Sequence, residues 1–314
     1  MLKYIAKRLL VLIIAVAGCT FLVFMLMRLV PLDFYDPVRH CLIIWQVSSP
    51  EAHWEWREMH GLNEPARVQY VRYMTGVLTG DFGTSFRSGM PVARELTAHL
   101  QHTLQLGLAA FSFSVLLALP VGIIAAIKRN TWVDKASMLI ALIGISIPVM
   151  WLGVLLVLFF SLRLGWLPSS GAAQWNSVIL PGMALGYAML SAMMLTARSS
   201  MLDIMKKDYI RTARAKGLSN SKIILKHALP NIIIPVLASF KAHLGIFFTS
   251  LIVIEVVFSR PGIGRLLVHS VLNRYNQMTL ACLIVFIFLF AFINFAVDIA
   301  KAFADPVMRR ERLC

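Results

Sequence analysis

Leu280–Ala302 reads LACLIVFIFLFAFINFAVDIAKA, an apolar run in which only Asp298 and Lys301 are charged. A helix needs about 20 mostly apolar residues to cross the hydrocarbon core of a bilayer. Strands that cross a membrane are about half as long and alternate apolar with polar residues. The length and continuity of this run therefore predict a membrane-spanning helix.

Five more runs of this kind precede it. They are Leu9–Leu29, Leu104–Ile127, Ala136–Leu162, Val178–Thr196 and Ile232–Ile254. Hydrophobic residues make up 59% of the chain and charged residues 14%, whereas soluble domains have about 45–50% and 25%. The sequence predicts an all-α membrane protein with six transmembrane helices. The run from 136 to 162 is as clear as the last one, and the run from 178 to 196 is the weakest because Pro181, Gly182 and Gly186 interrupt it.

The net charge of +15 is carried largely by the segments that face one side of the membrane. With the N-terminus inside, these segments hold Lys3, Lys7, Arg8, Lys128, Arg129, Lys135, eight basic residues between 198 and 226, Arg309, Arg310 and Arg312. The positive-inside rule then places both termini in the cytoplasm, although the external segment 259–279 also carries three arginines. The charge predicts contact with anionic membrane lipid rather than with nucleic acid.

The hydrophilic stretches divide the chain into three parts. Residues 1–30 are predicted to form an uncleaved first helix, because the apolar run continues well past Cys19. Residues 31–101 are predicted to form an external loop with two short helices, one from Ser49-Pro50 to Gly61 and one that opens at Pro65 and ends before Gly80-Asp81-Phe82-Gly83. Residues 102–314 hold the other five spans.

An inner segment, 198–231, lies between the fourth and fifth spans. It is dense in Lys and Arg, yet it keeps an apolar minority at helical spacing. This pattern predicts short amphipathic helices at a membrane surface or against a partner. Gly217 is expected to divide the segment, and Pro230 is expected to end it just before the fifth span.

No sequence pattern for catalysis or nucleotide binding is present. The chain has no G-x-x-x-x-G-K-[ST], H-E-x-x-H, G-x-S-x-G or C-x-x-C. His40, Cys41, His53 and His60 gather loosely outside the membrane and could bind a metal ion, but the interpretation as ordinary surface residues is favoured and no metal site is predicted. The sequence indicates that this chain is not an enzyme.

Three ionisable residues of the fifth span are candidates for a transport pathway, because such groups are costly inside a membrane. Lys241 and His243 lie in its middle and Glu255 at its end. Lys241 is expected either to line a water-filled path, where it meets a substrate carboxylate or Glu255, or to have a structural role, in which it snorkels to the membrane surface or forms a buried pair with another helix.

The inner segment resembles the "EAA" coupling loop of ABC importer permeases. Asp208–Leu218 reads DYIRTARAKGL and Ile223–Asn231 reads IILKHALPN. The family pattern is E-A-A, three residues, G, nine residues and I-x-L-P. Its second alanine, glycine and final dipeptide fall on Ala213, Gly217 and Leu229-Pro230. Arg211, Thr212 and His227 depart from it, and R-T-A-R-A-K-G-L is typical of the peptide/nickel branch, which contains dipeptide, oligopeptide and nickel permeases.

Other motifs support this resemblance over essentially the whole chain. Gly80–Phe86 reads GDFGTSF and Glu255–Gly264 reads EVVFSRPGIG, both similar to external motifs of the branch. Trp166-Leu167-Pro168 and Asp305-Pro306 also stand where the branch has them. One departure is Pro31–Pro37, where family members often read P-G-D-P.

The resemblance implies a type I ABC importer permease in the bacterial inner membrane, forming half of a pathway for small peptides. Implied partners are a second permease, either a homologue or a second copy, two cytoplasmic ATPase subunits and an extracytoplasmic substrate-binding protein. ATP and Mg would be bound by the ATPases, so no cofactor is expected in this chain. The implied coupling residues are Asp208, Arg211, Ala213, Ala215, Gly217, His227, Leu229 and Pro230, and the implied external loop or gate residues are Asp81, Gly83, Pro261, Gly262 and Gly264.

Three alternatives remain open at the level of sequence. The same architecture could import nickel or a metal chelate. An ion-coupled secondary transporter would need paired acidic residues deep in broken helices, and few are present. An intramembrane enzyme or assembly factor is disfavoured by the absent motifs.

Overall fold

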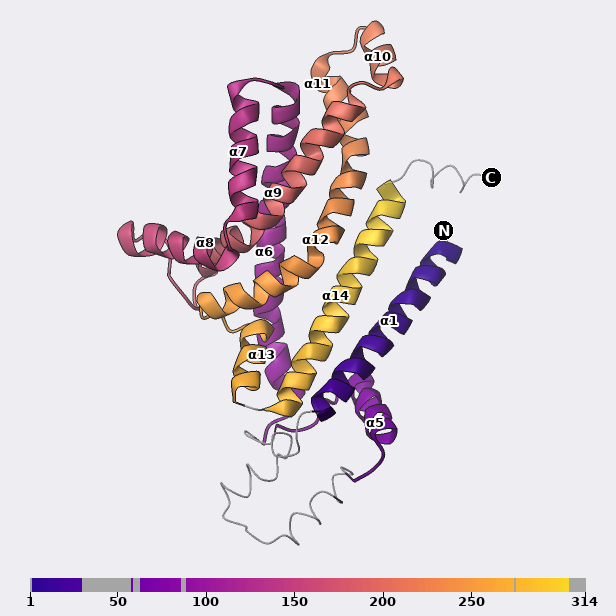
Figure 1. Cartoon of the computed structure of the whole chain (residues 1–314), viewed down its shortest axis with the longest axis vertical. Helices are drawn as coiled ribbons and strands as arrows, with labels where there is room; N and C mark the ends of the chain where they lie inside the picture. Colours follow the sequence, from indigo (N-terminus) through magenta and orange to yellow (C-terminus); the bar gives the residue numbers. More distant parts are fainter. Residues whose placement is uncertain (1, 30–57, 59–62, 86–88, 274, 305–314) are drawn as a thin grey trace. The chain divides into compact units, whose positions relative to one another are not determined.

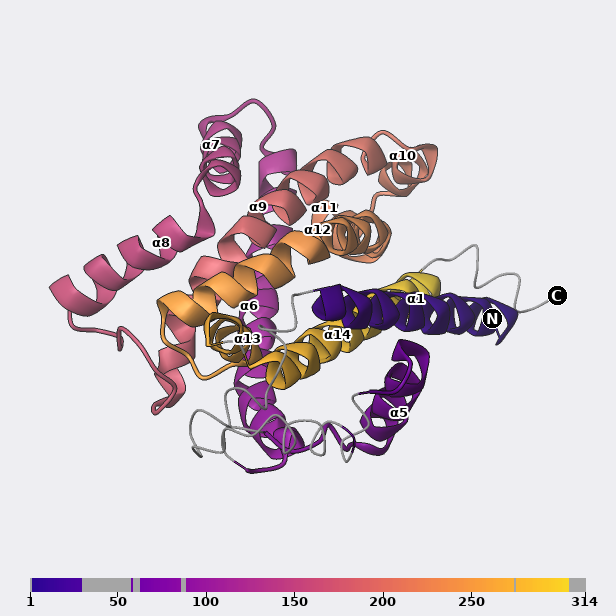
Figure 2. The ribbon, with the colours of Figure 1, turned by 60° about the horizontal axis from the view of Figure 1, so that its bottom comes forward.

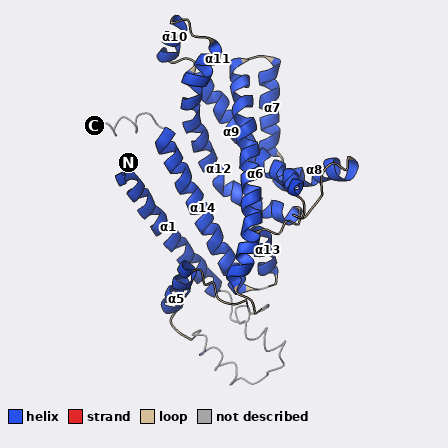
Figure 3. Cartoon of the chain, turned by 180° about the vertical axis from the view of Figure 1, so that it is seen from behind, coloured by secondary structure: helices blue, strands red, loops and turns tan. Residues whose placement is uncertain are grey.

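The structure is a computed structural model that describes residues 2–29, 58, 63–85, 89–273 and 275–304. This part of the chain is built from helices joined by turns, and its only β contact is an isolated bridge between Thr84 and Pro91. Figure 3 shows the helices in one colour along the described chain. The all-α class predicted from the sequence is confirmed.

The helices of Figure 1 have the following bounds. They are α1 Leu2–Leu29, α5 Ala66–Thr79, α6 Val92–Ile127, α7 Trp132–Ser146, α8 Val149–Leu156, α9 Ile179–Ile204, α10 Asp208–Ala215, α11 Asn220–Lys222, α12 Leu229–Val257, α13 Ile263–Leu272 and α14 Asn276–Ala304. Two π-helical turns, Val157–Arg163 and Ile223–Ala228, and a 3-10 turn, Trp175–Val178, complete them.

Five of these helical runs are long and apolar enough to cross a membrane by themselves. They are Ile5–Met27, Val92–Ile127, Trp175–Ile204, Asn220–Val257 and Asn276–Ala304. The pair Trp132–Ser146 and Val149–Arg163 makes a sixth span when it is counted as one. The six predicted spans are therefore present, and an even number of spans leaves both ends of the chain on one side.

The third span is bent rather than straight. Its two halves meet at 107°, and Figure 2 shows α8 running away from α7. The bend lies at Ile147, whose φ of −79° and ψ of 125° are extended. The next residue, Pro148, disfavours a helical conformation at Ile147 and has no N–H to donate. The expectation of one continuous helix over 136–162 was wrong for this reason.

The fourth span, expected to be the weakest, is a continuous helix and the most buried of the five single runs. Pro181 stands in its first turn, where a missing N–H costs nothing. Gly182 and Gly186 face α6: a Cβ on Gly186 would lie 2.6 Å from the carbonyl oxygen of Ala110. Small residues allow helix backbones to approach closely in membranes. The glycines that suggested interruption are therefore the contact surface between α6 and α9.

This contact makes Gly186→Ala a sharp test of the packing. The added methyl group would press on the α6 backbone, and overpacking of this kind costs about 1–3 kcal/mol. We expect the detergent-solubilised protein to melt at a lower temperature. Gly245→Ala is the matched control, because Gly245 is also helical and a Cβ there would meet nothing within 4 Å. Equal melting temperatures of the two variants would contradict the close α6–α9 contact.

The structure divides the chain into two compact units. One contains Met1–Leu9, Thr103–Arg260 and Phe292–Cys314, and the other contains Leu10–His102 and Pro261–Ala291. The first unit carries α7 to α12. Figure 1 shows α10 and α11 at the same end of this unit as the turn between α6 and α7.

The second unit holds the short external helix α5 against α1. Phe24 of α1 and Val77 of α5 share an apolar cluster with Leu280 and Ile284 of α14. The hydroxyl groups of Thr20 and Tyr70 hydrogen bond at 2.8 Å. The predicted helix after Pro65 and its end before Gly80, which has a φ of +84°, are confirmed. The other helix predicted outside, from Ser49-Pro50 to Gly61, lies outside the described residues.

Candidate coupling site

The helix α10 ends in a turn that requires a glycine. The N–H of Gly217 donates to the carbonyl oxygen of Arg214 at 2.9 Å, and the N–H of Leu218 donates to that of Ala213 at 3.3 Å. These two bonds form a Schellman motif, which needs a left-handed residue after the helix. Gly217 has a φ of +74° and fills this position without steric cost.

One face of α10 is buried in a small apolar cluster. Ile210 and Ala213 of α10 pack with Ile223, and Leu218 and Met205 lie at the edge of the cluster. Leu218 thus bonds to α10 through the backbone in the Schellman motif, and its side chain packs against the same apolar cluster. The turn and the cluster together hold α10 against the start of the helix that continues into α12.

The opposite face of α10 is exposed and mainly basic. The exposed residues are Asp208, Tyr209, Arg211, Thr212, Arg214, Ala215 and Lys216. Asp208 stands at the N-terminus of the helix, where a negative charge is favourable. Tyr209 is 45% exposed, and its partial burial raises the pKa of its phenol. The side-chain amide of Asn231 donates to the hydroxyl oxygen of Tyr209 at 3.4 Å and so links α12 to α10.

The second half of the inner segment is continuous with the fifth span. The helical run extends from Asn220 to Val257 and contains a π-helical turn at Ile223–Ala228. Pro230 stands in the first turn of α12 and does not end the segment, so the expectation that it would was wrong. His227 is half-buried in the π turn, and its carbonyl oxygen accepts a hydrogen bond from the Asn231 amide at 2.8 Å.

Lys241 is paired with a residue of another helix. Its ammonium group contacts Asp298 of α14 at 2.5 Å, and Arg8 of α1 contacts the second oxygen of the same carboxylate at 3.1 Å. Glu255 is fourteen residues further along α12, about 20 Å for a straight helix. The expectation that Lys241 could meet Glu255 was wrong, and the pairing with another helix is the arrangement found. His243 bonds to the carbonyl oxygen of Ser239, within its own helix.

Glu255 belongs to a different buried polar group. Its carboxylate accepts a hydrogen bond of 2.6 Å from Thr103 of α6. Arg260, also buried, donates to the side-chain oxygen of Gln105 at 3.0 Å. Burial lowers the pKa of the Arg260 guanidinium below its usual value, and the nearby charge of Glu255 offsets only part of this effect. Lys241, His243 and Glu255 are therefore not brought together into one pathway site.

The external motif Gly80–Gly83 is a hydrogen-bonded turn. The carboxylate of Asp81 accepts the N–H of Gly83 at 2.8 Å. Gly83 has a φ of +80°, and a Cβ there would overlap the side-chain nitrogen of Gln277, which donates to the carbonyl oxygen of Phe82. The other predicted external residues begin α13: Gly262 is its N-cap, Gly264 is buried in its first turn and Pro261 precedes it.

The comparison with family models decides the assignment. Residues 118–310 match the family "Binding-protein-dependent transport system inner membrane component". Residues 1–107 match "Binding-prot-dependent transport system membrane comp, N-term". The chain belongs to this permease family. It is a permease of a binding-protein-dependent ABC importer and resides in the bacterial inner membrane.

Curated relatives extend the match along the permease. The permease is 42% identical to the glutathione transport system permease protein GsiC of Salmonella paratyphi A. The alignment covers 98% of this chain and 99% of that GsiC. The GsiC of Escherichia coli K12 is 40% identical over the same shares. Among solved structures, an inward-facing MetNI methionine ABC transporter matches 67% of the permease and 96% of its own chain, with a TM-score of 0.57 and 20% identity. This last likeness concerns the fold.

One buried ion pair of the permease was not predicted from the sequence. Asp134, in the first turn of α7, and Arg198, near the end of α9, form a bidentate ion pair with distances of 2.6 and 2.8 Å. Each lies two residues beyond one end of a predicted span, and that placement was the available signal. The loose group of His40, Cys41, His53 and His60 lies outside the described residues.

Proposed function

We propose that this permease forms half of the translocation pathway for peptides of the size of glutathione, and that cytoplasmic ATPases drive it by binding the inner segment. The other half is a second permease subunit, and an external binding protein delivers the peptide. ATP and Mg are bound by the ATPases and not by this chain.

The geometry of α10 carries the proposal. Its apolar face is occupied by the cluster of Ile210, Ala213 and Ile223, so the exposed basic face is available to a partner. A short rigid helix with one face buried and the other exposed fits a groove on a partner protein. The Schellman turn at Gly217 and the link from Asn231 to Tyr209 fix the direction of this face relative to α12.

The choice of substrate rests on the relatives. Permeases that are 40–42% identical over 98% of the chain are named for glutathione transport. Glutathione is a small peptide, in agreement with the peptide substrate that the sequence favoured over nickel. We also propose Lys241, His243 and Glu255 as residues of the translocation pathway. In this role Lys241 acts through its ion pair with Asp298.

The test is uptake by the complete importer in proteoliposomes, with ATP inside and the binding protein outside. We expect ATP-dependent accumulation of radiolabelled glutathione, and co-purification of the ATPases with this chain. Labelled dipeptide and ⁶³Ni²⁺ are the comparison substrates. Uptake of nickel without peptide would contradict the proposed substrate. Uptake by the purified chain alone under an ion gradient would contradict the whole proposal in favour of a secondary transporter.

A further inference from the structure

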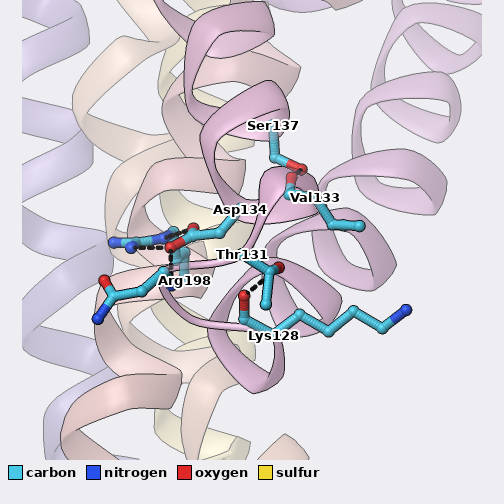
Figure 4. Close-up of polar contacts among 7 residues, drawn as sticks. Lys128, Thr131, Val133, Asp134, Ser137 and Arg198 are labelled. Atoms are coloured by element: carbon cyan, nitrogen blue, oxygen red, sulfur yellow. Dashed lines mark hydrogen bonds and ion pairs between the residues drawn. The ribbon is translucent and has the colours of Figure 1, made fainter.

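The ion pair between Asp134 and Arg198 uses every oxygen of the carboxylate. Arg198 Nε donates to Asp134 Oδ1 at 2.6 Å, and its terminal nitrogen donates to Oδ2 at 2.8 Å. The N–H of Asn130 donates to Oδ2 at 3.0 Å. The side chain of Asp134 is 4% exposed and that of Arg198 19%. Figure 4 shows the two side chains pointing toward one another from α7 and α9. Bidentate pairs of this kind fix direction as well as distance.

The pair joins two parts of the molecule that the chain separates by 64 residues. Asp134 closes the turn between α6 and α7, where Asn130 adopts a φ of +64° and Thr131 donates to the carbonyl oxygen of Lys128 at 2.6 Å. These bonds stay inside the turn, whereas Arg198 reaches it from another helix. Arg198 is six residues before the end of α9 at Ile204, about 9 Å along the axis, and α10 begins four residues after that end.

The rest of α9 is packed tightly on the same two helices. A Cβ on Gly122 of α6 would lie 2.7 Å from the carbonyl oxygen of Met194, and one on Gly144 of α7 would overlap Ser191. Tyr187 donates to the carbonyl oxygen of Ile140 of α7 at 3.0 Å. Close-packed interiors transmit displacement because they have little free volume. The three helices α6, α7 and α9 therefore present one packed body to the inner segment.

We propose that Asp134 and Arg198 are positioning residues for energy coupling: their ion pair clamps the α6–α7 turn to the end of α9, so that displacement of α10 moves α7 and the bent half-span α8. This inference rests on the proposed function, in which ATPases bind α10. Without the clamp, the packing of α9 still holds α6 and α7, but the α6–α7 turn is no longer fixed to the end of α9 next to the inner segment, and ATP hydrolysis is no longer converted fully into opening of the pathway.

The test measures glutathione uptake and ATP hydrolysis together in the complete importer, which gives the ATP hydrolysed per glutathione imported. We expect Asp134→Asn to lower uptake about tenfold, while ATP hydrolysis changes by less than about twofold and the ATPases still co-purify. The number of ATP molecules used per glutathione then rises about tenfold. A clamp that only stabilised the fold would lower both activities together and leave this ratio unchanged.

Two further variants complete the test. Arg198→Met combined with Asp134→Asn is expected to import no less than Asp134→Asn alone, because both changes break one interaction. Ser137→Ala is the matched control: Ser137 lies one turn further along α7, and its hydroxyl group donates to the carbonyl oxygen of Val133 within that helix. Figure 4 labels both residues. We expect the ratio in this variant to equal that of the unaltered chain.

An unchanged ratio in Asp134→Asn, or losses that multiply in the double variant, would overturn the inference. Failure of the proposed function has a different signature, because the unaltered chain would then lose its ATPases on purification or import none of the three labelled substrates.

Discussion

Gly217→Pro is expected to abolish uptake by the assembled importer while the six spans still insert. Proline fixes φ near −65°, whereas Gly217 has a φ of +74°. Proline also removes the N–H that bonds to Arg214, and it disfavours the near-helical conformation of Lys216. Together these conflicts cost about 3 kcal/mol or more. A cost of this size lowers the equilibrium constant for folding of the α10 turn about 100-fold, and we expect uptake to be lost as the turn unfolds.

The measurement is glutathione uptake and ATP hydrolysis by the reconstituted importer, with insertion checked by the yield of the chain in the membrane fraction. Gly217→Ala is the control for side-chain volume, since a Cβ at this position would meet nothing within 4 Å. Its cost is that of a left-handed alanine, about 1 kcal/mol, so we expect uptake to fall by less than tenfold. Equal uptake by the proline variant and the unaltered chain would show that α10 is not the coupling element.

The sequence predicted the spans because crossing a bilayer requires a long apolar run, and such runs stand out by themselves. It did not predict the bend at Ile147, although Pro148 follows and restricts it. Proline is tolerated inside membrane helices, as Pro120 in α6 shows, so its presence alone does not decide between a bend and a continuous helix. The conformation is set by how neighbouring helices pack.

The glycines of α9 illustrate the same limit in the opposite direction. Gly182 and Gly186 lower helix propensity by about 1 kcal/mol each, which made the fourth run look weak. In the structure they allow α6 to approach, and this packing outweighs the intrinsic preference. A single sequence contains the propensity of a glycine but not the partner that it faces.

The candidate site divides in the same way between local and distant information. The inner segment could be predicted because a Schellman turn, an amphipathic face and a helix start are all encoded within a few residues. The partners of the buried charges could not be predicted from the sequence, since Lys241 and Asp298 are 57 residues apart in the chain. Pairing in three dimensions decided which carboxylate neutralises which cation, and Glu255 was the wrong candidate for Lys241.

Asp298→Ala is expected to destabilise the permease by about 3 kcal/mol, because it removes one partner from a mostly buried ion pair. The Asp298 side chain is 10% exposed and neutralises Lys241, which is 28% exposed, and Arg8, which is 43% exposed. Without the carboxylate, the partly buried ammonium group of Lys241 loses this partner, and its uncompensated desolvation is the main cost. We expect the melting temperature of the detergent-solubilised protein to fall by about 5 °C or more.

Three comparisons separate this effect from a general loss of charge. Asp203→Ala breaks an exposed pair with Lys206, in which Asp203 is 73% exposed, and exposed pairs contribute less than about 1 kcal/mol. Lys241→Met leaves Asp298 paired with Arg8 and is expected to cost less than Asp298→Ala. Adding Lys241→Met to Asp298→Ala removes the unpaired cation, so the double variant is expected to melt above the Asp298→Ala variant. If the Asp298→Ala variant has the same melting temperature as the Asp203→Ala variant, the three charges do not hold α1, α12 and α14 together. Uptake by Lys241→Met, measured on protein that still assembles, then tests Lys241 as a pathway residue separately from its part in the fold.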